Sequence, residues 1–76
     1  MVTFEEAVNI AKSVRDNLDL CVEYENGYVF SSKDDDGYIG GLNHVPVVVL
    51  KKNGRLADMN TFMFSNPGDE IRRVSI

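Results

Sequence analysis

The sequence is poor in the residues that most often build catalytic and metal sites. Its 76 residues include one cysteine, Cys21, and one histidine, His44. A single cysteine excludes an internal disulfide framework and favours a reducing compartment. A lone histidine cannot form a zinc site by itself, and no recognisable carboxylate partner or nucleophile motif accompanies it. We therefore expect a protein that is not an enzyme and that uses no cofactor or metal.

Long apolar runs are absent as well. No segment approaches the roughly 18 apolar residues that a membrane-spanning helix needs. The first residues, Met1-Val2-Thr3-Phe4-Glu5-Glu6, lack the basic and apolar regions of a signal peptide. The sequence thus predicts a soluble, cytoplasmic protein without a membrane partner.

Basic clusters are also scarce. Twelve acidic residues against eight basic ones give a net charge of −4, and the basic pairs Lys51-Lys52 and Arg72-Arg73 are short and far apart in sequence. Binding to a phosphate backbone needs clustered Lys and Arg on one face, so we expect no nucleic-acid partner. An acidic surface keeps a small protein soluble and also suits a basic protein partner.

What the chain does contain is the pattern of one helix followed by strands. Thr3 and Glu6 have the spacing of a capping box at a helix start. Apolar residues then recur every three or four positions, which predicts an amphipathic helix from about Phe4 to Leu18. These residues are Phe4, Ala7, Val8, Ala11, Val14 and Leu18.

Two hairpins are predicted after the helix. The period changes to two at Leu20, and Asn26-Gly27 separates this run from Tyr28–Ser32. An Asn-Gly pair between β-prone runs is a strong hairpin signal, because both residues of the tight turn take positive φ. The unbroken apolar run in Val45–Lys51 predicts a strand covered on both faces, and Asn53-Gly54 turns it into Arg55–Met59.

The last third of the chain allows more than one reading. Asn60-Thr61-Phe62-Met63-Phe64 fits a short strand or a wall of the core. Asn66-Pro67-Gly68 could start a short helix through Val74, or turn into an extended tail or strand, which we favour. The expected fold is α+β, a single domain over residues 1–76. In it, the N-terminal helix packs on an antiparallel sheet of about four strands.

The acidic run Asp34-Asp35-Asp36-Gly37 invites a comparison with calcium loops. An EF-hand spaces its acids at alternate positions and places a glutamate six residues after the glycine. Here the aspartates are contiguous, and Asn43 occupies that later position. The run therefore indicates an exposed acidic loop and no metal site.

Four segments in this order resemble the immunity protein 35 family, which includes YrhB-like small bacterial proteins. They are the N-terminal helix, the strand Gly27–Ser32, the segment Gly40–Val49, and Lys51–Leu56 with its Asn-Gly turn. The resemblance implies a cytoplasmic antidote from a bacterial polymorphic-toxin system, which binds its cognate toxin and blocks it. It carries over no binding residues, because the shared motifs are those that build the fold.

If this implication holds, acidic and aromatic residues are the candidates for meeting a basic toxin domain, since complementary charge speeds association and excludes wrong partners. They are Asp34, Asp35, Asp36, Tyr38, Glu23 and Glu25. Two alternatives remain open: a folding helper or peptide-binding module that uses a sheet edge at Phe62–Phe64, and a small enzyme or metal protein. The identity of the partner and the oligomeric state stay open too.

Overall fold

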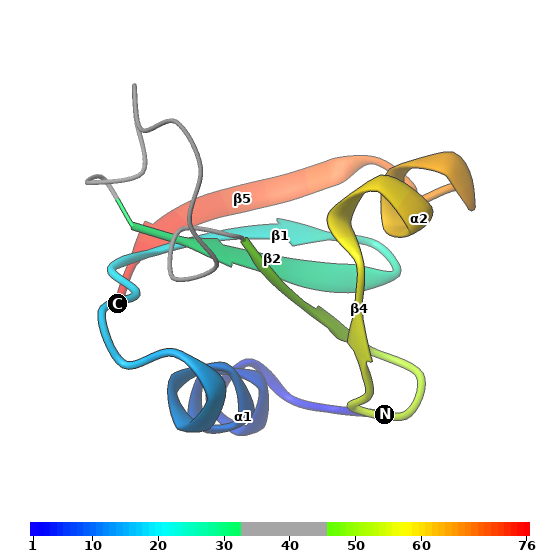
Figure 1. Ribbon diagram of the computed structural model, residues 1–76. Helices are drawn as coiled ribbons and strands as arrows, with labels where there is room; N and C mark the ends of the chain where they lie inside the picture. Colours follow the sequence, from blue (N-terminus) through cyan, green and yellow to red (C-terminus); the bar gives the residue numbers. More distant parts are fainter. Residues whose placement is uncertain (33–45) are drawn as a thin grey trace.

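A helix and a short second helix lie on opposite faces of an antiparallel sheet (Figure 1). The computed structural model describes residues 1–32 and 46–76. Within them the elements are α1 (Phe4–Val14), β1 (Leu20–Tyr24), β2 (Gly27–Ser31), β3 (Val47–Leu50), β4 (Leu56–Ala57), α2 (Met59–Phe64) and β5 (Glu70–Ser75). The strand order is β4-β3-β2-β1-β5. The predicted α+β class is confirmed, and the sheet has five described strands where about four were expected.

Helix α1 begins where the sequence predicts and ends earlier. The Glu6 amide donates to Thr3 Oγ1, and the Thr3 amide donates to Glu6 Oε1, both at 3.2 Å, so the capping box is confirmed. The helix ends at Val14, because Arg15 takes an extended backbone conformation and residues 16–17 form a turn. Aspartate and asparagine favour such turns by bonding nearby backbone groups. Leu18 is buried as expected, but from the loop after the helix.

The first hairpin forms at the predicted place with a different turn. Glu23 pairs with Tyr28, and the connection between β1 and β2 consists of Glu25 and Asn26. Neither Asn26 nor Gly27 has a positive φ, so the predicted turn geometry is wrong. Gly27 lies in β2, where the ring of Phe62 and the carbonyl oxygen of Val49 leave no room for a side chain.

The second hairpin is confirmed, with Gly54 at φ +72° in its turn. Its first strand is shorter than predicted, and position 45 lies outside the described residues. Strand β4 has two residues, because Asp58 then caps α2 by accepting the Thr61 amide at 3.1 Å. Phe62-Met63-Phe64 is therefore helical, so the strand reading is wrong and the proposed peptide-binding edge is removed. Phe62 itself is buried and forms a wall of the core, which was the other reading.

The C-terminal segment forms an edge strand, β5, paired antiparallel with β1. This confirms the favoured extended reading over a short helix. Arg72 pairs with Glu23 and Glu70 pairs with Tyr24, so Ile71 is the extra residue of a β-bulge. A bulge and two arginines are features that discourage further strand pairing at an edge.

Each face of the sheet carries its own apolar cluster. On the α1 face the buried residues are Ala7, Ala11, Leu18, Cys21, Tyr28, Phe30, Val47 and Val49. On the α2 face they are Val29, Val48 and Phe62. The run of three valines in β3 therefore serves both faces, as predicted for a covered strand.

Candidate functional site

Glu23 on β1 bonds side chains from β5 and from the turn that follows β3. Its Oε2 accepts a bond from Lys51 Nζ at 2.6 Å, and its Oε1 accepts one from Arg72 Nε at 2.8 Å. The Glu23 and Lys51 side chains are 13% and 11% exposed, whereas Arg72 is half exposed. The Lys51 bond, with a smaller contribution from Arg72, lowers the pKa of Glu23 below its ordinary value.

Aromatic rings complete this cluster. Lys51 Nζ lies 5.1 Å from the centre of the Tyr28 ring, and the Arg72 guanidinium lies 4.8 Å from the centre of the Phe4 ring. The two rings are themselves 6.0 Å apart. Cation–π contacts of this kind link the charged groups to α1. The arrangement stabilises the fold and commits the Glu23 carboxylate to internal contacts.

Glu25 also makes internal contacts. Its Oε1 accepts the Asp69 amide at 2.7 Å, and its backbone amide donates to the Asp69 carbonyl at 3.1 Å. Gly68 lies so close that a β-carbon there would approach the Glu25 Cβ to 2.6 Å. Glu25 thus fastens the β1–β2 turn to the loop that leads into β5, although its side chain is exposed.

The remaining candidates from the sequence lie outside the described residues. The lone histidine, His44, lies outside them too, and the candidates are Asp34, Asp35, Asp36 and Tyr38. Their proposed role in binding a partner stays a prediction.

Cys21 is fully buried in the cluster on the α1 face. Burial, with the nearby Glu23 charge as a smaller cause, raises the pKa of its thiol to about 12. A thiol with so high a pKa is a poor nucleophile at neutral pH. Within residues 1–32 and 46–76, no group of three or more His, Cys, Asp or Glu side chains could hold a metal ion.

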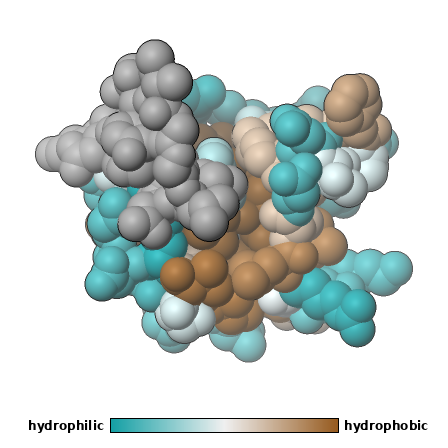
Figure 2. Space-filling view, viewed as in Figure 1, coloured by the Kyte–Doolittle hydropathy of each residue, from teal (hydrophilic) through white to brown (hydrophobic). Residues whose placement is uncertain are grey.

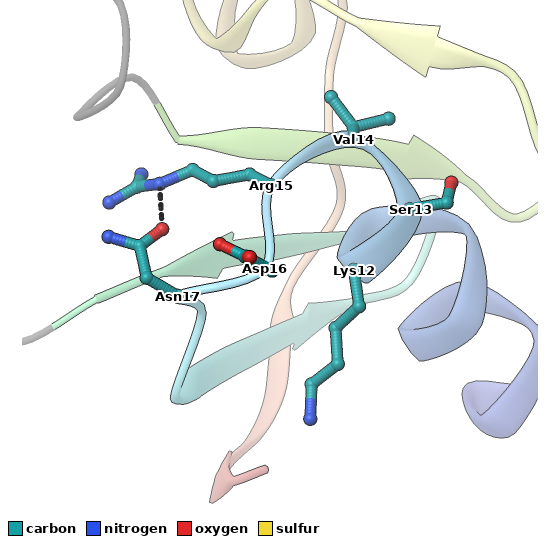
Figure 3. Close-up of a pocket in the computed structure, with 6 residues that line it drawn as sticks. All are labelled: Lys12, Ser13, Val14, Arg15, Asp16 and Asn17. Atoms are coloured by element: carbon teal, nitrogen blue, oxygen red, sulfur yellow. Dashed lines mark hydrogen bonds between the residues drawn. The ribbon is translucent and has the colours of Figure 1, made fainter.

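A polar depression lies at the end of α1 (Figure 3). It is lined by Lys12, Ser13, Val14, Arg15, Asp16 and Asn17. The Arg15 Nε donates to Asn17 Oδ1 at 2.7 Å, and Val14 points away from Lys12. One helix end and its turn supply every lining residue. The site therefore lacks the convergence of several elements that typically orients a substrate.

Apolar side chains on the surface are the feature that sequence patterns did not indicate. Figure 2 shows a continuous hydrophobic band between α1 and β4. Leu56 is 50% and Val14 is 55% exposed, while Phe64 on α2 is 92% exposed. Periodicity assigned Val14 to the buried face of the helix. No pattern in the sequence indicated that Leu56 or Phe64 would be exposed.

Register explains how the band forms. Leu56 pairs with Val49, which belongs to the cluster on the α1 face, so Leu56 points to that same face. Ile10 and Val14 lie one turn apart on α1. A β-carbon on Gly54 in the β3–β4 turn would lie 3.4 Å from Ile10 Cδ1, which places this turn against the helix. We call Ile10, Val14 and Leu56 the α1–β4 ledge.

Comparisons with protein-family models, curated proteins and solved structures give no match. No helix in the described part of the chain has the length and apolar character needed to cross a membrane.

Proposed function

We propose that this protein binds another protein, and that it neutralises a cognate polymorphic toxin by direct contact. The observation that carries the proposal is the exposed apolar surface of so small a fold, above all Phe64 and the α1–β4 ledge. Exposed apolar patches rimmed by polar residues mark interaction sites, and aromatic side chains are frequent anchors there. The toxin as partner rests on the family resemblance of the sequence.

Charge gives this proposal a second component. Asp34, Asp35 and Asp36 supply three of the twelve acidic residues, and the chain has a net charge of −4. A basic toxin surface would be attracted to them, with Tyr38 as a neighbouring anchor. Glu23 and Glu25 contribute less to this proposed contact, because their carboxylates bind groups of the protein itself.

The test is affinity purification from the native organism, followed by expression of the captured protein with and without this chain. We expect one partner in equal amount, with a domain that stops growth when expressed alone and is harmless in the presence of this protein. Capture of many unfolded proteins would favour the folding-helper alternative instead. Capture of no stoichiometric partner would contradict the proposal.

A further inference from the structure

The outer edge of β4 combines backbone groups that bond none of the other described residues with an exposed apolar side chain, Leu56. The Leu50 amide donates to the Arg55 carbonyl at 2.9 Å, so these opposite residues form a hydrogen-bonded pair. Such pairs alternate along an antiparallel ladder, and Val49 with Leu56 is therefore a pair without mutual bonds. The N–H and C=O of Leu56 consequently point outward, away from β3.

The other edge of the sheet differs in its chemistry. Strand β5 carries the bulge at Ile71, and its arginines bind Glu23 and Glu70. Strand β4 has neither a bulge nor a charge at its two positions. Its outward-pointing backbone groups also adjoin the α1–β4 ledge, so one segment could reach backbone and apolar partners together.

The charge of the β3–β4 turn adds a feature of the partner. Lys52 and Arg55 lie in this turn, just before the edge strand β4, and both are exposed. Because Arg55 is opposite Leu50, its side chain points to the α2 face, where the intervening side chains of an extended segment would also point. Neither forms an ion pair with another of the described residues, in contrast to Lys51, which binds Glu23. An acidic side chain on a docked segment would complement them.

From this geometry we infer that the α1–β4 ledge binds an extended segment of the protein partner, which adds to the sheet beside β4. The segment carries apolar residues at alternate positions, facing Ile10, Val14 and Leu56, and an acidic residue near Lys52 and Arg55. Main-chain bonds at Leu56 would fix its register, and the alternating side chains would give specificity. The inference rests on the proposed function, because it names the surface that the partner occupies.

A peptide tests the ledge without the cellular partner. The probe is an acetylated heptapeptide of alternating valine and threonine with a glutamate at each end, titrated into ¹⁵N-labelled protein. We expect saturable amide shifts centred on Leu56 and Ala57, and weaker binding when lysines replace the glutamates. Shifts centred on β5, no saturable shift at Leu56, or equal binding of the lysine peptide would overturn the inference.

Matched variants separate the ledge from other exposed apolar positions. Leu56→Thr removes the apolar side chain and keeps a residue that suits strands. Ile71→Thr does the same on the opposite edge strand at similar exposure, 54% against 50%. We expect Leu56→Thr to lower the affinity for the peptide by about tenfold and Ile71→Thr to leave this affinity unchanged. Circular dichroism should show that both variants are folded.

The same variants distinguish failure of the ledge from failure of the proposed function. If the cellular partner binds Leu56→Thr as tightly as the unmodified protein, the inference that the partner occupies the ledge is wrong, and the proposed toxin-binding function is unaffected. If the peptide binds at Leu56 while no partner is captured from the organism, the toxin-binding function fails and the ledge stands as a peptide site.

Discussion

The ring of Phe62 fills the space where a β-carbon of Gly27 would be, with Cε1 2.8 Å from that position. Phe62 is 3% exposed, and it packs edge-on against Tyr24 with ring centres 5.9 Å apart. The ring therefore has little room to move. This contact joins α2 to the first hairpin and explains a glycine that the turn itself does not require.

Gly27→Ala is expected to destabilise the protein by about 1–3 kcal/mol, because the added methyl group overpacks this contact. Urea unfolding measures the effect. The matched background is Phe62→Leu, whose smaller side chain leaves room for the methyl group. The cost of Gly27→Ala should then be smaller, whereas an equal cost in both backgrounds would show that the ring is not the cause.

Two phenylalanines of α2 should differ sharply in their effect on stability. Phe62→Ala removes a buried ring and is expected to cost about 3–5 kcal/mol. Phe64→Ala, at a position 92% exposed, should change stability by less than about 0.5 kcal/mol. Thermal unfolding followed by circular dichroism compares them. A large loss of stability in Phe64→Ala would mean that its ring packs within the fold and is no free anchor.

The Glu23 cluster predicts a loss of stability in acid. The folded pKa of Glu23 lies below its ordinary value of 4.5, so the cluster contributes stability above about that pH. This contribution is lost as the pH falls through the folded pKa. Glu23→Gln should cost about 1–3 kcal/mol at pH 7 and show a shallower decline in acid, as measured by urea unfolding across pH.

Glu70→Gln is the control for that experiment. Glu70 bonds Arg73 at 2.9–3.0 Å, but both side chains are well exposed. Water and salt screen such pairs, so the acid profile should stay close to that of the unmodified protein. Similar acid profiles for both variants would show that the buried ion pair of Glu23 contributes no more to stability than the exposed pair of Glu70.

Cys21 is expected to be unreactive in the folded state. Its thiol is fully buried, and its pKa is raised from 9.0 to about 12. Ellman's reagent at pH 8 should therefore label it only after unfolding in denaturant. Stability should fall as the pH rises above about 9, because the unfolded thiol ionises first. Rapid labelling of the native protein would contradict this placement of the thiol.

The acidic residues outside the described part of the chain give a kinetic prediction. Replacing Asp34, Asp35 and Asp36 with asparagine changes the net charge from −4 to −1. Association with a basic partner should slow, and its rate should depend less on salt. Stopped-flow or surface-based kinetics at several salt concentrations measures both. Unchanged kinetics would remove these three residues from the proposal.

Local signals in the sequence predicted much of the fold. The capping box at Thr3 predicted the start of α1, and the second Asn-Gly pair predicted the place of the β3–β4 turn, although Gly54 alone of that pair has a positive φ. The end of α1 was missed, because Val14 and Leu18 continue the helical spacing although the chain turns at residues 16–17. Helix α2, with six residues, is too short for periodicity to identify.

The candidate site was harder to predict than the fold. Glu23 lies two positions after Cys21 on the same face of the strand, and the sequence marks it as an ordinary strand residue. Its two cations come from positions 28 and 49 residues further along the chain. Only the sheet order brings Lys51 and Arg72 to it. The α1–β4 ledge likewise depends on register, because the pairing of Leu56 with Val49 decides which face Leu56 joins.

The central claim is that this protein works by binding one protein partner, and calorimetric titration with the partner captured from its own organism tests it most directly. We predict a 1:1 complex for the unmodified protein, with affinity about tenfold lower for Leu56→Thr. Absence of binding heat across a range of temperatures, together with separate elution of the two proteins in gel filtration, would contradict the account.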